Sequence, residues 1–315
     1  MNAKSSEIAQ GPSLVSEPLE TPRRRRFNAR RLGLHNYVLI TPAYAVFVFV
    51  LIVPIGAAIW FSMFHFDFGG RTWVGTDNYR AVLGDDATWH ALQVTVIFTL
   101  MAVIGGMAIA LAVALLLYPL PTRVRNFFRS TLYLPAIIPI AATALIWKWL
   151  FNYSFGFLNY LLGTIGLGPY DWLGSLHLAL PSVTGMVLAT GLGATILILL
   201  AAIDAVPRDY LEAAQIDGAG TWTIFRRILL PLIKPALLYL VVVQTISAFQ
   251  VFAPFVLMTK GGPINRTTTL GYQVYTTAFE SFDFGRASAL AVVMLVVISA
   301  IAVIEFRLLR SNVQY

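Results

Sequence analysis

Several residue types that commonly carry chemistry are missing or rare in this sequence. There is no cysteine among the 315 residues, which excludes disulfides and thiolate–metal sites and leaves the redox compartment undecided. The four histidines are scattered through the polar tail and the expected loops without the spacing of metal ligands, so we expect no metal site. No Ser-His-Asp or paired-carboxylate arrangement of the catalytic kind stands out. We therefore do not expect this chain to be an enzyme.

A nucleotide-binding loop is also missing. The Walker A pattern G-x-x-x-x-G-K-[ST], whose backbone N–H groups hold nucleotide phosphates, does not occur in the chain. If the chain takes part in an ATP-driven process, ATP and Mg²⁺ must be bound by a partner subunit. No cofactor is expected on this chain itself.

Charge is scarce, and long apolar runs take its place. Charged residues make up 12% of the chain, about half the share in a soluble domain, whereas 58% of the residues are hydrophobic. The apolar runs are long enough to cross a lipid bilayer as helices, and they lack the alternation of a membrane barrel. We predict an all-α integral membrane protein with six transmembrane helices, at residues 37–63, 91–117, 131–151, 180–201, 231–258 and 287–309.

The first 36 residues differ in composition from the rest. They are polar, contain serine and proline, and include the basic cluster Arg23–Arg26. Such a segment cannot bury a core, so residues 1–36 are predicted to be a disordered tail. The apolar run that follows is too long for a signal-peptide core, which favours an uncleaved anchor. Residues 37–315 then form the six-helix membrane domain.

The distribution of lysine and arginine predicts the orientation. With the N-terminus inside, about three times as many of these residues lie in the inner segments as in the outer loops, which is a clear positive-inside bias. Both termini and the loop between the fourth and fifth spans are therefore predicted to be cytoplasmic. Because the basic residues segregate to one side of the membrane, the net charge of +7 does not indicate nucleic-acid binding.

This fourth loop, residues 204–231, carries the most specific motif. It fits the pattern E-A-A-x3-G-x9-I-x-L-P at every fixed position: Glu212, Ala213, Ala214, Gly218, Ile228, Leu230 and Pro231. The loop resembles the cytoplasmic coupling loop of permease subunits of binding-protein-dependent ABC importers. In that family the loop docks on an ATPase subunit. The resemblance implies the same role for these residues and for Asp217.

The residues of the loop are also consistent with a docking element on physical grounds. Tyr210 to Gln215 are good helix formers, and Gly218 permits the left-handed conformation that ends a helix. Trp222, Phe225 and Ile228 recur on one face of a second short helix, and Pro231 is expected to restart the chain as a membrane helix. Glu212 is our candidate for a charged contact with the ATPase. An ordinary amphipathic hairpin at the membrane surface is the alternative.

Other segments resemble the carbohydrate-uptake branch of that family, of the maltose or glycerol-phosphate type. They are Trp73–Tyr79, the proline-kinked third span with Pro135 and Pro139, Met258–Pro263, and Phe282–Ala289. The resemblance implies a type I ABC importer permease fold with a cytoplasmic coupling helix. It also implies a second homologous permease subunit, most often in a heterodimer, two ATP-binding subunits, and an extracytoplasmic solute-binding protein. The location would be the cytoplasmic membrane of a bacterium or archaeon.

Polar residues in the fifth span are candidates for the solute path. Gln244, Ser247 and Gln250 follow one another at spacings of three residues, with Phe249 nearby. Because an unpaired amide in hydrocarbon is costly, these side chains should face a partner helix or a wet cavity. Amides and aromatic rings together suit a sugar. Hydrogen bonding between helices is an equally open interpretation.

Two alternatives concern the function itself. Lys148, near the end of the third span, would suit an anionic solute such as a glycerophosphodiester, although extension of its side chain to the membrane interface explains it as well. An ion-coupled transporter would need an ionisable relay within the membrane, and the spans offer only Lys148 and Glu305, each near one end. The transported solute is not identified by the sequence.

Overall fold

The computed structural model describes residues 34–67 and 70–309, which are mostly helical. The chain divides into two units, residues 1–53 and 54–315, and we describe each separately. Within the first unit lie α1 (Leu34–Phe47) and the π-helical segment Val48–Ile52. The predicted tail falls outside the described residues, except that α1 already begins at Leu34. α2 (Val53–Phe61) continues the helical run into the second unit.

Five of the predicted spans correspond to long apolar helices. The structure has five helices that are long and apolar enough to cross a membrane, or up to six if one bent pair counts as a span. These candidate spans are Ile40–Phe61, Asp86–Leu117, Ala179–Asp204, Thr221–Thr259 and Phe284–Leu308. They contain α4 (Asp86–Leu117), α8 (Ala179–Asp204), α11 (Leu230–Gln250) and α13 (Phe284–Leu309).

The third predicted span, residues 131–151, is not a single helix. It is divided between α5 (Thr122–Ile137) and α6 (Ile140–Leu150), which are bent by 94° relative to each other. Ile138 has an extended conformation, with φ −76° and ψ 130°, because the ring of Pro139 disfavours a helical residue before it. The expected proline kink is therefore a break, and the first helix extends back to Thr122.

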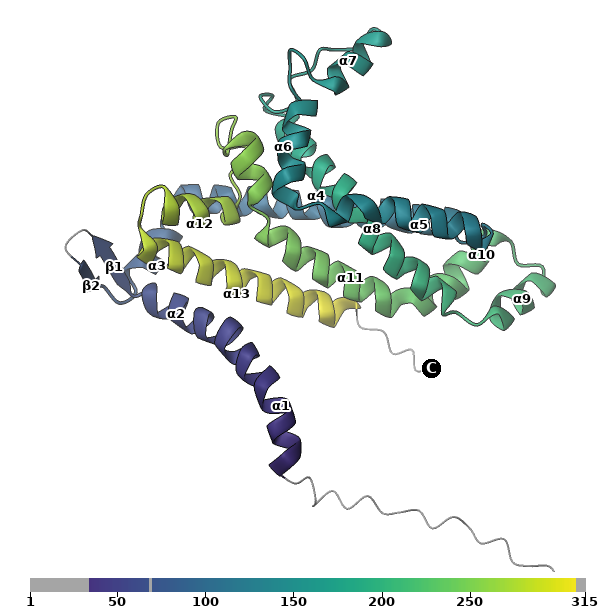
Figure 1. The fold of residues 1–315 in the computed structure, drawn as a ribbon, viewed down its shortest axis with the longest axis horizontal. Coiled ribbons are helices and arrows are strands. Elements are labelled where there is room, and N and C mark those ends of the chain that lie inside the picture. The colour runs from purple at the N-terminus through teal and green to yellow at the C-terminus, as the bar shows by residue number, and fades with distance from the viewer. Residues whose placement is uncertain (1–33, 68–69, 310–315) are drawn as a thin grey trace, which may run out of the picture. The chain divides into compact units, whose positions relative to one another are not determined.

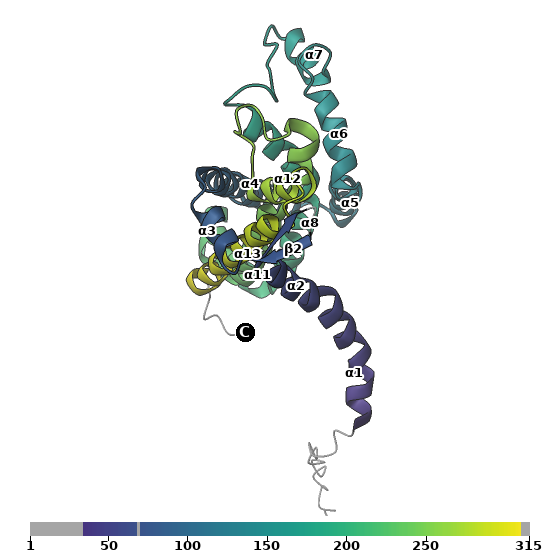
Figure 2. The same cartoon turned by 90° about the vertical axis from the view of Figure 1, so that its left-hand side faces the viewer.

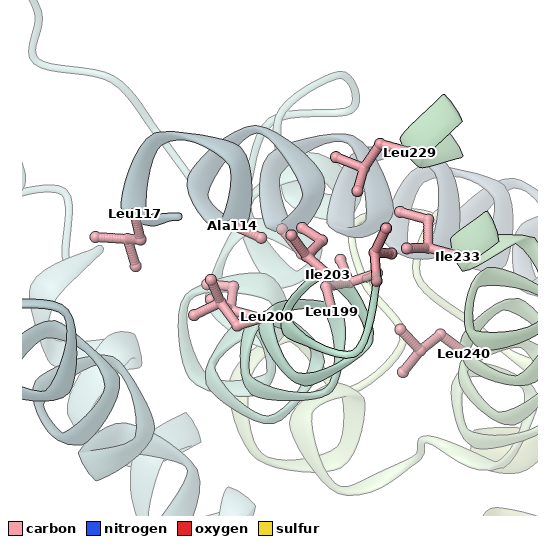
Figure 3. Packing of buried hydrophobic residues seen from close by; sticks show 11 residues of the cluster. Ala114, Leu117, Leu199, Leu200, Ile203, Leu229, Ile233 and Leu240 are labelled. Atoms are coloured by element: carbon pink, nitrogen blue, oxygen red, sulfur yellow. The ribbon is translucent and has the colours of Figure 1, made fainter. Parts of the chain in front are cut away.

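Within the second unit, α8 packs against α4 and α5, while α11 packs against α4 and α13. Buried side chains from α4, α8 and the start of α11 form one apolar cluster (Figure 3). The labelled members are Ala114, Leu117, Leu199, Leu200, Ile203, Leu229, Ile233 and Leu240. Because lipid tails are as apolar as these side chains, the cluster is stabilised mainly by close packing and not by transfer out of water.

One glycine allows an unusually close approach between two of these helices. A Cβ atom added at Gly193 of α8 would lie 2.2 Å from the backbone oxygen of Leu132 in α5. No side chain fits at that distance. Gly193 therefore sets the distance between α5 and α8.

The short elements gather at two ends of the second unit. Figure 1 shows α9 (Arg208–Ile216) and α10 (Thr221–Ile224) at one end, and α3 (Asp77–Leu83), α12 (Leu270–Phe279) and a two-stranded hairpin at the other. The hairpin, β1 (Phe64–Asp67) with antiparallel β2 (Gly70–Trp73), is a small departure from the all-helical prediction. α6 and α7 (Phe157–Thr164) project away from the packed helices (Figures 1 and 2).

Candidate functional site

The loop with the E-A-A motif folds as a helix, a tight turn and a second helix. α9 begins after Pro207, has Asp209 in its first turn, and contains the good helix formers that predicted it. It ends in a left-handed turn at Gly218, where φ is +78°. The N–H of Ala219 donates to the Ala214 carbonyl at 2.9 Å, and the N–H of Gly218 donates to the Gln215 carbonyl at 3.0 Å. This pair of bonds is a Schellman motif, and the predicted turn at Gly218 is confirmed.

The second half of the loop differs from the prediction. α10 runs without a break through the π-helical segment Phe225–Leu229 into α11, so Pro231 does not restart the helix. A wide π turn is one place where a helix accommodates a proline without its N–H donor. The extra residue of that turn also changes which side chain faces inward. Leu229 is buried in the apolar cluster, whereas Ile228 and Leu230 of the motif are only half-buried.

The outward surface of α9 is uncovered. Glu212 and Ala213 are exposed, and within the described part of the chain the Glu212 carboxylate has no hydrogen-bond or ion-pair partner. Tyr210, Ile216 and Trp222 add large apolar side chains that are 57, 86 and 70% exposed. An apolar patch around an unpaired carboxylate is typical of a surface that another molecule covers. We call these five residues the α9 surface.

A groove lies behind the α9 surface. It has a volume of about 560 Å³ and runs between the end of α4 and the two short helices. Leu115 and Tyr118 line it on one side, and Leu211, Trp222 and Phe225 on the other. The rings of Trp222 and Phe225 lie 5.3 Å apart. α9 is thus held at the end of the bundle by few contacts, as expected for an element that moves.

Asp204, the first residue of the fourth loop as predicted, is the last residue of α8 in the structure. Its Oδ1 accepts a hydrogen bond from Arg125 Nη1 at 2.8 Å, and its Oδ2 accepts one from Arg129 Nη2 at 2.7 Å. Sequence reasoning missed this cluster. The four-residue spacing of two arginines on the amphipathic α5 was the available signal.

The predicted solute-path residues do not all lie together. Gln244 and Ser247 line a cavity of about 280 Å³ between α8 and α11, where Thr195 is a further polar residue. Phe249 is 1% exposed and packs inside the protein, and neither it nor the exposed Gln250 lines this cavity. Gln244 Nε2 also donates to Thr195 Oγ1 at 3.0 Å. Gln244 therefore fits both interpretations, as a cavity residue and as a link between helices.

The ionisable side chains near the ends of the spans have local partners. Lys148 Nζ donates to the Leu257 carbonyl at 2.9 Å, within the π-helical segment Phe255–Thr259. Thr245 Oγ1 donates to Glu305 Oε1 at 2.8 Å and joins α11 to α13. Neither side chain lines the cavity around Gln244. Within the described residues no group of three His, Asp or Glu side chains could hold a metal ion.

The Gly-Gly-Pro segment at the other end of the protein is a tight loop. Gly261 has φ +77°, and a Cβ added there would lie 2.8 Å from the ring of Tyr272. Thr267 Oγ1 donates to the Gly262 carbonyl at 2.6 Å. Burial raises the pKa of the Tyr272 phenol above its ordinary value, and the nearby Glu280 carboxylate raises it further.

Long apolar helices, with an exposed helix–turn–helix that carries the E-A-A motif at one end, are consistent with a membrane permease of the ABC-importer type. Comparison with known families agrees. The chain belongs to the family described as binding-protein-dependent transport system inner membrane component, whose model matches residues 106–314. It is therefore the membrane subunit of an importer in which nucleotide is bound by partner ATPases, and not an enzyme by family.

Named relatives cover nearly the whole chain. A probable ABC transporter permease of Sinorhizobium fredii, y4oQ, is 35% identical over 90% of this chain and 93% of its own length. The sulfoquinovosyl glycerol transport system permease SmoG of Agrobacterium fabrum is 30% identical over 87 and 90%. The sn-glycerol-3-phosphate transport system permease UgpA of Salmonella typhimurium is 32% identical over 89 and 95%.

A solved structure has the same fold. A chain of a bacterial ABC transporter that imports the acidic polysaccharide alginate matches with a TM-score of 0.78 at 22% identity, over 89% of this chain and 96% of that chain. A chain of the MetNI methionine transporter matches with a TM-score of 0.53, over 72% of this chain and 97% of that chain. The type I importer permease fold, predicted from the motif, is confirmed.

Proposed function

We propose that this chain is one of two permease subunits of an ATP-driven importer for a sugar, an oligosaccharide or a related polyol derivative. The single observation that carries the coupling role is the α9 surface, an uncovered helix with an unpaired Glu212 that ends in the left-handed turn at Gly218. The solute class rests on the relatives named for sulfoquinovosyl glycerol and sn-glycerol-3-phosphate. An extracytoplasmic binding protein delivers the solute.

In the proposed mechanism, α9 docks in a groove of an ATPase subunit. Glu212 makes the charged contact there, and Ala213 and Ala214 allow a close approach because their side chains are small. Asp217 and Gly218 form the turn that sets the angle between α9 and α10. ATP-driven closure of the two ATPases moves the loop, the helices open the cavity to the binding protein, and hydrolysis resets it. Each conformation is favoured by its own set of contacts, as a two-state transporter requires.

The remaining partners follow from the same assignment. We propose a heterodimer with a second, homologous permease and two ATP-binding subunits that hold ATP and Mg²⁺. Both termini and the α9 surface lie on the cytoplasmic side of a bacterial or archaeal membrane, which the charge bias supports.

For the solute path we propose the cavity between α8 and α11. Its wall is mostly apolar, and Gln244, Ser247 and Thr195 offer amide and hydroxyl groups that can pair with sugar hydroxyls. No lysine or arginine is among its lining residues, so this cavity offers partners for hydroxyl groups and no positive charge for a phosphate or sulfonate group. Because Gln250 lies outside it, Gln250→Leu should leave the KM for uptake within about two-fold of wild type.

Uptake by the reconstituted complex tests the proposal. The permease pair, the ATPases and a loaded binding protein are placed in liposomes, and neutral sugars, glycerol 3-phosphate and a glycerophosphodiester are compared as solutes. We expect uptake only with ATP and binding protein, and with a sugar or polyol. Uptake driven by a proton or sodium gradient without ATP would overturn the assignment. Uptake of the glycerophosphodiester alone would restrict it to the alternative solute.

A further inference from the structure

Two arginines of α5 hold the carboxylate at the end of α8. Arg125 and Arg129 lie one helical turn apart and each binds a different oxygen of Asp204, at 2.8 and 2.7 Å. The side chains of Arg125, Arg129 and Asp204 are 17, 26 and 32% exposed, so their charges are partly withdrawn from water. Arginine suits such a site because its planar, weakly hydrated group holds a carboxylate in fixed geometry. We call these three residues the Asp204 clamp.

The position of Asp204 indicates that its negative charge is stabilised by the two arginines and not by α8 itself. The last turn of a helix carries a partial negative charge and favours cations, so a carboxylate there opposes the helix dipole. Two guanidinium groups outweigh that repulsion. Arg125 Nη1 also lies 3.5 Å from the carbonyl of Tyr118, the residue at the end of α4. The clamp thus joins the ends of α4 and α8 to the side of α5.

The clamp lies directly beside the coupling helix. Only Ala205 and Val206 separate Asp204 from Pro207, the N-cap residue of α9. Val206 is 7% exposed and belongs to the same apolar cluster as the end of α8. So short a connection, fixed at its middle, leaves α9 little freedom to move without the end of α8.

A second contact fixes α5 to α8 further along. The backbone of Leu132 lies so close to Gly193 that α5 and α8 are in direct backbone contact at this point. Beyond the 94° bend, α6 is linked through Lys148 to the Leu257 carbonyl. A continuous set of contacts therefore leads from α9 through α5 to α6 and the segment after α11.

We propose that Asp204, Arg125 and Arg129 are positioning residues that make α5 move together with the coupling helix, so that displacement of α9 reaches the bend and α6. This inference rests on the proposed coupling role of α9. It extends that role to side chains outside the E-A-A motif. For this role the clamp must stay closed through the transport cycle.

The first test is Asp204→Asn, which keeps the shape of the side chain and removes its charge. The matched control is Asp77→Asn, which removes an ion pair with Arg80 whose side chains are 81 and 66% exposed at the other end of the protein. In the reconstituted complex we expect Asp204→Asn to lower solute uptake per ATP hydrolysed by about three- to thirty-fold. In Asp77→Asn the uptake per ATP hydrolysed should equal that of wild type. In Asp204→Glu, which restores the charge, most of the wild-type uptake per ATP should return.

The second test uses the absence of cysteine from the chain. Arg129→Cys and Asp204→Cys are combined and joined with a short reagent that carries two thiol-reactive groups, such as a bis-methanethiosulfonate, and each single-cysteine variant is treated alike. A covalent link should return uptake per ATP toward wild type, because it replaces the ion pairs. If Asp204→Asn fails to assemble, the cross-linked double variant still tests the inference.

Two results would overturn the inference. One is a ratio for Asp204→Asn equal to that of Asp77→Asn. The other is a cross-linked pair that hydrolyses ATP but no longer transports, which would mean that the clamp must open. In both cases wild-type uptake with ATP and binding protein still upholds the proposed function. Loss of the proposed function would appear instead as no ATP-dependent uptake by wild type.

Discussion

Replacing Gly218 by alanine perturbs the coupling loop through its backbone alone. At φ +78° a Cβ added to Gly218 meets no heavy atom within 4 Å, so the variant creates no clash. The cost is that of holding an L-residue in the left-handed region, about 1–2 kcal/mol. That free energy disfavours the native turn by a factor of about five to thirty. Relaxation of the turn would break the two Schellman bonds and change the direction of α9.

The chain provides a matched control for this substitution. Gly166, in the segment between α7 and α8, also has φ +78° and open space around its Cβ position. Gly166→Ala should therefore cost about the same free energy of unfolding, and thermal denaturation in detergent should show equal shifts for the two variants. Only Gly218→Ala is expected to lower ATP hydrolysis stimulated by the loaded binding protein, by about five-fold or more.

Two further variants should change stimulated ATP hydrolysis by less and by more than alanine does. Gly218→Asn should be milder than alanine, since asparagine tolerates the left-handed conformation. Gly218→Pro should be more severe, because proline fixes φ near −65° and removes the N–H that binds the Gln215 carbonyl. Equal losses of stimulated hydrolysis in Gly218→Ala and Gly166→Ala would refute the reasoning, as would full stimulation and uptake in Gly218→Pro.

Two remaining predictions concern contacts between helices. Gly193→Ala should separate α5 from α8, because its Cβ would lie 2.2 Å from the Leu132 oxygen. The thermal stability of this variant should fall well below that of the control Gly185→Ala, whose Cβ has open space around it. Equal stability of the two variants would contradict the close packing of α5 against α8. Gln244→Leu removes the hydrogen bond to Thr195, which costs about 0.6 kcal/mol, so the stability of the protein should change little. The KM for uptake should rise because the cavity loses an amide group. An unchanged KM would show that Gln244 only links the two helices.

Local features of the chain made much of the fold predictable. The length of an apolar run sets whether a helix can cross a bilayer, and five such runs correspond to candidate membrane spans in the structure. Pro139 ends a helix at the residue before it, so the interruption of the third span was predictable, whereas its 94° angle was not. Gly218 was predictable as a helix end for a similar reason, since few other residues adopt its conformation.

Contacts between distant segments were not predictable in this way. Arg125 and Arg129 lie 79 and 75 residues from Asp204, and nothing in the local sequence of either segment points to the other. Which side chains of α11 face the cavity was not predictable for a related reason. Phe249 follows the polar series closely in sequence, yet in the folded protein it packs inside and away from the cavity.

Local sequence was enough to predict a helical membrane permease, the approximate place of five spans, and the loop that carries the coupling motif. Folding was needed to show where the third span is divided and which face of each helix is covered. Leu229 and not Ile228 is buried because a π turn shifts the register, and Gln244 meets Thr195 because α8 and α11 pack there. The physical reason is that lipid is as apolar as the helices. Hydropathy therefore marks the spans but does not mark the faces by which they pack.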